Sequence, residues 1–162
     1  MAIQADSVDA AAVQASVDTA VAEWVGLISS STMQGFLDWA SPMDISLADI
    51  DALLNVNVRA PFIASKAALA HLVNGGRIIT IADRVPTPIL SAYAATKSAL
   101  AAFTNVAARE LGPKEVTVNL VPPGSIDTDM FPANGPHTET AKQRLDADCR
   151  LRRERVDAER AG

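Results

Sequence analysis

The sequence predicts an α/β protein, in which helices alternate with parallel strands and cover both faces of a sheet. Two short runs rich in Val, Ile and Thr predict strands, and stretches with apolar residues at helical spacing precede and follow them. The chain has 162 residues, of which 49% are hydrophobic, so one compact domain can form a core.

The N-terminal part of the chain carries one clear helix. Apolar residues from Asp9 to Trp24 recur at helical spacing and predict an amphipathic helix. Residues 2–5 before it are predicted to be the end of a short strand. Residues 28–35, by contrast, show the period of neither a helix nor a strand.

A longer helical region is predicted next. Ser46 is a good N-cap, with Asp49 three residues later in the first turn, and the helical pattern continues to Val58. Pro61 allows a break or kink, and helical spacing resumes from Phe62 to Val73.

The remaining elements follow in the order strand, loop, helix, strand. They are a helix stop at 74–76, a buried strand at 77–81, a proline-containing loop at 83–90, a long helix at 91–111 ended by Gly112-Pro113, and a strand at 116–121. Ligands of parallel sheets bind beyond the carboxyl ends of the strands, so we expect a site there.

The net charge of −5 is unevenly distributed. Residues 1–140 carry 7 basic and 14 acidic side chains, whereas residues 141–162 carry 7 and 5. An acidic body lacks the concentrated basic face that nucleic-acid binding needs, so we predict no nucleic-acid partner. We predict one domain over residues 1–140 and a charged tail, helical or disordered, over residues 141–162.

Cysteine and histidine are scarce. Cys149 is the single cysteine, so no internal disulfide can form, and a reducing, cytoplasmic compartment is expected. No histidine accompanies Cys149 to activate it, and His71 and His137 lie in no cluster with metal-ligand spacing. The N-terminus has no signal-peptide pattern and no apolar run is long enough to span a bilayer, so we predict no metal site and no membrane partner.

Tyr93 and Lys97 lie four residues apart in the helix predicted at 91–111, so their side chains share one face. A nearby ammonium group favours the phenolate and lowers the pKa of a tyrosine, which can then act as a general acid or base near neutral pH. The same spacing also arises by chance, in two exposed side chains on a helix.

Several motifs together resemble the short-chain dehydrogenase/reductase family. Tyr93-Ala94-Ala95-Thr96-Lys97 is similar to its Tyr-x-x-x-Lys motif, and Asn57, within residues 55–62, matches its structural and relay asparagine. The strand at 76–81, the Pro-Gly turn and Thr-Asp-Met within residues 118–130, and the strand end at Ala5-Asp6 also match, in the family's order and spacing. The resemblance covers residues 2–24 and 36–137.

This resemblance implies hydride transfer between NAD or NADP and a small-molecule alcohol or carbonyl substrate. Tyr93 would be the proton donor or acceptor, Lys97 would lower its pKa and hold the nicotinamide ribose, and Asn57 would position a water in a proton relay. The implied cofactor-binding residues are Asp6, Lys97, Pro123, Gly124 and Thr128. Plainer explanations exist for two of these motifs: Asn57 can simply satisfy a helix backbone, and Pro123-Gly124 can be only a turn.

The sequence departs from the family at its start. The Gly-x-x-x-Gly-x-Gly turn, which in this family meets the pyrophosphate at a helix N-terminus, does not occur in the 162 residues. The predicted fold is therefore an incomplete Rossmann-like, doubly wound parallel sheet that lacks the first strands and the last strand. The residue that selects NAD or NADP would follow the missing second strand.

The family's catalytic serine has no clear counterpart. Asp83 occupies its place in the strand register, and the loop from there to Tyr93 is short, which indicates a deletion. Thr80 has the family's spacing to Tyr93 but lies inside the predicted strand. Loss of one hydrogen-bond donor to the substrate oxygen costs on the order of 100–1000-fold in rate, so we expect impaired catalysis.

A frame-shifted stretch would explain the lack of pattern in residues 25–35. These residues can be encoded by codons which, read from the third base of each codon, give Gly-Leu-Asp-Ile-Leu-Val-Asn-Asn-Ala-Gly, the strand and motif that the family carries there. We hypothesise two compensating insertions or deletions, which the nucleotide sequence of the gene tests. Serines 29–31 should weaken the sheet, because each buried unpaired hydroxyl costs about 1–3 kcal/mol.

Three functions remain open: an impaired enzyme of this family, a non-catalytic interaction protein, and a pseudogene product or sequencing artefact without selected function. For the second, the helices at 61–73 and 91–112 match the pair that forms the family's main subunit interface, in a homodimer or homotetramer. A face of small residues on the later helix would permit close approach of a partner helix. It consists of Ala99, Ala102, Val106 and Ala107.

Overall fold

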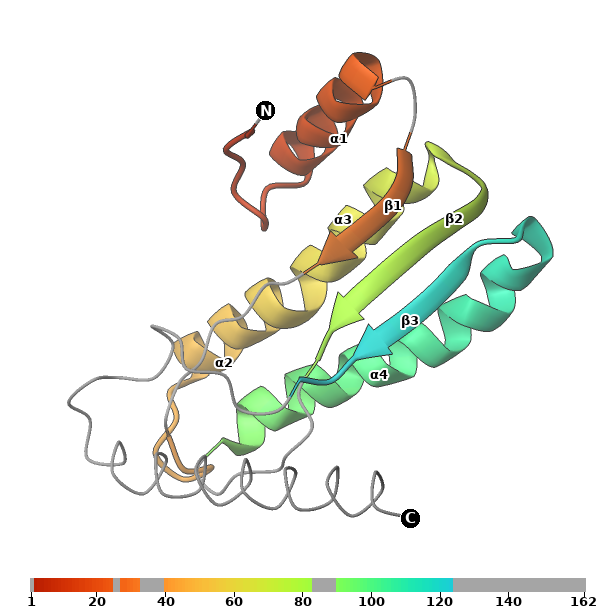
Figure 1. Ribbon diagram of the computed structural model, residues 1–162. Coiled ribbons are helices and arrows are strands. Elements are labelled where there is room, and N and C mark those ends of the chain that lie inside the picture. The colour runs from red at the N-terminus through yellow and green to blue at the C-terminus, as the bar shows by residue number, and fades with distance from the viewer. Residues whose placement is uncertain (1, 25–26, 33–39, 83–89, 124–162) are drawn as a thin grey trace, which may run out of the picture. The chain divides into compact units, whose positions relative to one another are not determined.

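The computed structural model shown in Figure 1 describes residues 2–24, 27–32, 40–82 and 90–123. All of these residues lie within one compact unit, Met1–Pro123. A second unit, Gly124–Gly162, lies outside the described residues, so the domain over residues 1–140 and the tail over 141–162 stay predictions.

The described sheet has three parallel strands in the order β1 (Leu27–Thr32), β2 (Leu72–Ile81) and β3 (Thr117–Val121). Ile78 of β2 pairs with Ser30 on one side and with Val118 on the other. The parallel α/β architecture is confirmed, as are the strands expected at 77–81 and 116–121. β2, however, begins five residues earlier than expected.

β1 is a strand that the sequence pattern does not predict. Residues 28–35 have no strand period, yet Leu27–Thr32 pairs in parallel with β2. A parallel ladder is built from main-chain N–H and C=O groups, so β2 can hold a neighbouring strand whose side chains do not alternate in polarity.

The strand end predicted at residues 2–5 is wrong. These residues are exposed and form no strand, and the described sheet places no strand beside them.

The helices begin and end near their predicted residues, with one exception. α1 is Ala10–Trp24, and α4 is Ser91–Leu111, followed by a single 3₁₀ turn, η2 (Gly112–Lys114). α2 (Leu47–Leu54) starts after Ser46, whose hydroxyl accepts the Asp49 N–H at 3.1 Å, as predicted. The exception is α3 (Ala60–Leu69), which ends four residues before Val73 because Leu72 pairs with β1 instead.

The core lies between the sheet and helices α3 and α4. Ile78, Ala107 and Val118 form its buried centre, and the partly buried Phe103 packs against them. α3 and α4 lie side by side (Figure 1), and the ring centroids of Phe62 and Phe103 are 4.3 Å apart. Both helices connect neighbouring parallel strands in the same direction across the sheet, and right-handed crossovers then place them on one face. Ala107 thus faces the core, and its assignment to a subunit-contact face was wrong.

Candidate active site

The helical region that carries Asn57 contains a wide, π-helical segment, η1 (Asn55–Arg59), between α2 and α3. Here the Ala60 N–H bonds to the Asn55 carbonyl, five residues earlier. Pro61 explains the wide turn, because it has no N–H and in an α-helix its ring would clash with the Asn57 carbonyl four residues earlier. The break or kink expected at Pro61 therefore takes the form of one wide turn, a feature frequent at functional sites.

Asn57 is fully buried and reaches across to α4. Its Nδ2 donates a hydrogen bond to Thr96 Oγ1 at 3.1 Å, and Thr96 Oγ1 donates in turn to the Tyr93 carbonyl at 2.6 Å. Thr96 is 3% exposed. The explanation that Asn57 serves only the backbone of its own helix does not account for this bond to a second helix.

Lys97 extends from α4 to the carboxyl end of β2. Its Nζ donates to the Ile81 carbonyl at 3.4 Å and lies 5.6 Å from the centroid of the Tyr93 ring. Lys97 is 5% exposed and Tyr93 is half-buried, so the pair is not two exposed side chains on a helix. A buried ammonium group needs stabilising neighbours, and a carbonyl oxygen and an aromatic face are two that the structure provides.

This cluster borders the carboxyl ends of two strands. The Ala82 N–H donates to the Val121 carbonyl at 3.0 Å, which holds the ends of β2 and β3 together. Ligands of parallel sheets bind beyond such ends. A phenol placed there with an ammonium group beside it can exchange a proton with a substrate oxygen.

Other predicted site residues lie elsewhere or outside the described residues. Asp6 is exposed, and its Oδ1 accepts the Val8 N–H at 3.0 Å in the turn before α1. Pro123 is half-buried, two residues after β3. Three further residues fall outside the described ranges: Asp83, Gly124 and Thr128.

Thr80 and Thr96 illustrate what spacing along the chain can and cannot find. Thr80, at the family's spacing for the serine, is 1% exposed inside β2, and its Oγ1 has no hydrogen-bond partner in the part of the chain described. A threonine inside the strand does not take the place of a loop serine. The sequence indicates Thr96 only as part of the Tyr-x-x-x-Lys motif, although helical spacing puts it on the same face as Tyr93. Its bond to Asn57 joins residues 39 positions apart and leaves no local signal.

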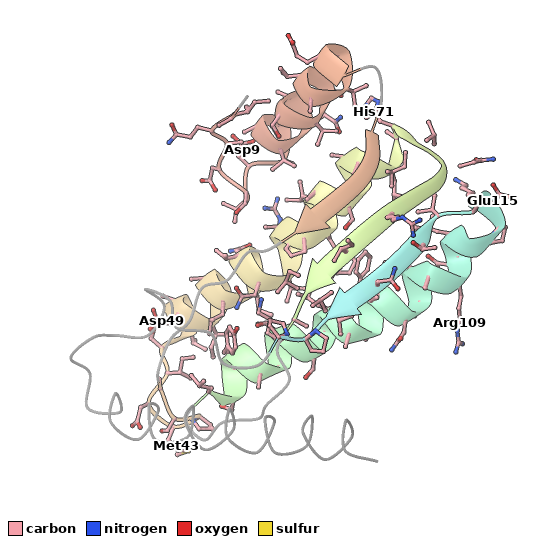
Figure 2. All side chains as sticks on the ribbon, viewed as in Figure 1. Asp9, Met43, Asp49, His71, Arg109 and Glu115 are labelled. Atoms are coloured by element: carbon pink, nitrogen blue, oxygen red, sulfur yellow. The ribbon has the colours of Figure 1, made fainter. Side chains whose placement is uncertain are left out.

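His71 belongs to a different part of the molecule. Figure 2 shows it beside the amino end of β2, opposite to the carboxyl ends of the strands. Its Nε2 lies 3.0 Å from Asp18 Oδ1, in a partly exposed pair.

Over the described ranges, no group of three His, Cys, Asp or Glu could hold a metal ion. A search of the same ranges finds no helix with the length and apolar character needed to cross a membrane. Cys149 and His137 lie outside these ranges.

A parallel sheet with a buried lysine and a tyrosine near its carboxyl end defines an α/β protein with a candidate acid–base site. The profile of the short chain dehydrogenase family matches residues 1–139, and the chain belongs to this family. This confirms the resemblance drawn from the motifs.

Two solved structures and one relative of known sequence are similar to this chain. A dehydrogenase/reductase from Sinorhizobium meliloti superposes with a TM-score of 0.81 at 44% identity, over 89% of this chain and 59% of its own. A short chain dehydrogenase from Burkholderia cenocepacia in complex with NADP gives a TM-score of 0.78 at 47% identity, over 87% of this chain and 59% of its own. A cyclic-di-GMP-binding biofilm dispersal mediator protein of Escherichia coli is 45% identical over 98 residues, which are 58% of this chain and 41% of that protein.

The chain spans about half the length of these relatives, between 41% and 59% for the three just described. The three described strands are therefore a part of the Rossmann-like sheet of these neighbours, and the predicted fold class is confirmed.

Proposed function

We propose that the chain binds NAD or NADP beside Tyr93 and Lys97 and carries the acid–base part of an alcohol or carbonyl oxidoreductase. The observation that carries this proposal is Lys97, which is 5% exposed at the carboxyl end of β2 with its Nζ 5.6 Å from the Tyr93 ring centroid. Family membership supports the class of reaction, and the relative solved with NADP supports the cofactor.

Each residue of the cluster has one proposed role. In alcohol oxidation, the phenolate of Tyr93 takes the hydroxyl proton while the carbon-bound hydrogen leaves as hydride, so that a carbonyl group forms. A nicotinamide cofactor bound beside Tyr93 and Lys97 would supply the hydride acceptor for this direction and the hydride donor for the reverse. Lys97 stabilises the phenolate and holds the nicotinamide ribose, and Asn57 positions a relay water. Asp6, Pro123, Gly124 and Thr128 complete the proposed cofactor-binding set.

We further propose that this chain by itself is a weak catalyst. Its 162 residues contain no Gly-rich pyrophosphate turn, and Asp83 stands in the register of the family's serine. A carboxylate cannot donate a hydrogen bond to a developing oxyanion, and one missing donor costs on the order of 100–1000-fold in rate.

Cofactor binding is tested by the melting temperature with NADH or NADPH at millimolar concentration. A nucleotide that binds only the native chain raises the melting temperature, and the larger shift identifies the preferred cofactor. Lys97→Met should abolish the shift, whereas Lys66→Met, which changes an exposed lysine of α3, should preserve it. No shift of the unmodified chain with either nucleotide would overturn the proposal.

A second candidate function, self-association without catalysis, is favoured by apolar side chains on the outer surfaces of α3 and α4. Phe62 is 45% exposed and Val106 is 56% exposed. Val106 shares a helix face with Ala99 and Ala102, which are half-buried and exposed. We propose a homodimer or homotetramer through the helices within residues 61–73 and 91–112, in which intact relatives could also take part.

Light scattering on the eluting protein tests this second function. The unmodified chain should have a multiple of its 17.0 kDa mass. Val106→Glu should shift it toward the monomer, whereas Met43→Glu, at a residue 91% exposed outside these helices, should not. A strictly monomeric unmodified chain would rule the second function out.

Three other predictions from the sequence remain proposals of the same kind. They are a cytoplasmic location, a domain over residues 1–140 with a charged tail over 141–162, and the alternative of a pseudogene product. A chain that expresses and unfolds cooperatively would exclude the last of these. Codons of residues 25–35 that are incompatible with the recovered family sequence would exclude the frame-shift hypothesis.

A further inference from the structure

The bond between Asn57 and Thr96 links the two helical elements that supply the site. Asn57 lies in the middle of η1, and Thr96 lies in α4 directly before Lys97 and three residues after Tyr93. The bond from Asn57 Nδ2 to Thr96 Oγ1 is 3.1 Å long, and both side chains are buried. It is therefore shielded from competing water.

The Thr96 hydroxyl has a fixed orientation. A hydroxyl group has one hydrogen to donate and two lone pairs to accept with. Its hydrogen is directed to the Tyr93 carbonyl at 2.6 Å, which leaves the lone pairs to accept the Asn57 amide. One hydroxyl thus connects the wide turn of η1 to the turn of α4 that runs from Tyr93 to Lys97.

We propose that Thr96 is a positioning residue of the site, which holds Tyr93 and Lys97 in register with η1 through its bond to Asn57. The inference rests on the proposed function, because it assigns Thr96 its importance through the acid–base role of Tyr93. If α4 rotated against η1, Lys97 would move away from the Ile81 carbonyl, the partner outside α4 that holds its ammonium group 5.6 Å from the Tyr93 ring centroid. The side chain would then change its distance to the ring, although both residues lie on α4. That distance governs how strongly the ammonium group favours the phenolate.

α4 also contains a matched control residue. Thr104 is a threonine eight residues further along α4 and 5% exposed, close to the 3% of Thr96. Its Oγ1, unlike that of Thr96, has no hydrogen-bond partner within the described residues. Replacement of either threonine by valine conserves shape and removes only the hydroxyl. The difference between the two variants therefore reports the bond rather than the burial.

The test uses the ionisation of Tyr93, which is the single tyrosine of the chain. The ultraviolet absorbance change on phenol ionisation in the full chain therefore reports this residue alone, with Tyr93→Phe as the blank. We expect the unmodified chain to titrate below the ordinary tyrosine pKa of about 10. Thr96→Val should raise the pKa by about one unit, a tenfold change in the phenolate ratio. Thr96→Ser should restore it, and Thr104→Val should leave it unchanged.

The outcomes separate the inference from the function on which it rests. An unmodified chain that titrates at the ordinary value would overturn the acid–base role of Tyr93, and the role of Thr96 with it. A lowered pKa that Thr96→Val leaves unchanged, or that Thr104→Val raises equally, would overturn the inference alone. If Thr96→Val does not fold, Thr96→Ala replaces it, and its effect should vanish in an Asn57→Ala background; an undiminished effect there would also overturn the inference.

Discussion

The Lys97 ammonium group lies 5.6 Å from the centre of the Tyr93 ring, one turn further along α4, and bonds to the carbonyl with which β2 ends. This relationship ties an acid–base pair to the carboxyl end of a parallel sheet, where such sheets bind ligands. It also buries the charge of Lys97. Burial of a charge costs folding free energy, so a contribution to stability alone does not explain this lysine.

Replacement of Lys97 by methionine should separate function from stability. The variant loses the cation that favours the phenolate, so Tyr93 should ionise at higher pH than in the unmodified chain. The melting temperature should stay the same or rise, because an apolar side chain of similar length fills the site without the cost of a buried charge. Absorbance titration and thermal unfolding measure the two effects, and a large loss of stability would contradict the functional assignment of Lys97.

Replacement of Ser46 by alanine should destabilise the chain by about 1 kcal/mol, because the side-chain oxygen that accepts the Asp49 N–H at the start of α2 is lost. Urea unfolding measures the change. Ser98→Ala is the control, since that exposed hydroxyl donates to a carbonyl of its own helix, that of Ala94, at 2.8 Å and caps no helix end. Equal losses in the two variants would show that Ser46 does not act as a cap.

Replacement of Ile78 by alanine should cost about 2–5 kcal/mol, because Ile78 is fully buried at the centre of the core. A loss of that size is a large share of the roughly 5–15 kcal/mol that stabilises a typical domain, so the midpoint of urea unfolding should fall to a much lower concentration. Val73→Ala, at a residue 53% exposed in the same strand, should change the free energy of unfolding by no more than about 0.5 kcal/mol, as measured by urea unfolding. A small effect at Ile78 would mean that the core described here does not stabilise the chain.

Replacement of Gly75 by alanine should destabilise the chain by about 1–2 kcal/mol, because Gly75 has φ of +85°, a left-handed conformation that residues with a Cβ atom adopt at a cost. Gly75→Asn is the control, since asparagine tolerates this conformation better than alanine, and it should cost less. Urea unfolding measures both changes, and equal costs for the two variants would contradict the left-handed conformation at Gly75.

The sequence predicts those elements whose pattern is local. α4 is expected at residues 91–111 and is observed at Ser91–Leu111, because its apolar spacing lies within the element and the Gly112-Pro113 stop follows directly after it. The cap at Ser46 is confirmed for the same reason. Helical spacing likewise brings Tyr93 and Lys97 to one face, although it gives no information on the burial of Lys97.

Elements that depend on contacts with residues far away in the sequence cannot be predicted from local patterns. β1 exists through its pairing with β2, and the end of α3 is set where Leu72 begins to pair with Leu27. The Asn57–Thr96 bond likewise depends on the packing of η1 against α4, which no spacing along the chain specifies. Asp83, Gly124 and Thr128 lie outside the described residues, so their assignments rest on the sequence.

The wide turn at Asn55–Arg59 also sets the phase of the helical pattern on either side of it. An α-helix rotates by about 100° per residue, so the extra residue of a π-turn moves every later side chain around the axis by nearly that angle. α2 accordingly packs against α4, while α3 packs against the sheet and α1. One residue gained or lost in this turn would rotate the apolar side of α3 away from the sheet, although no residue of α3 itself had changed.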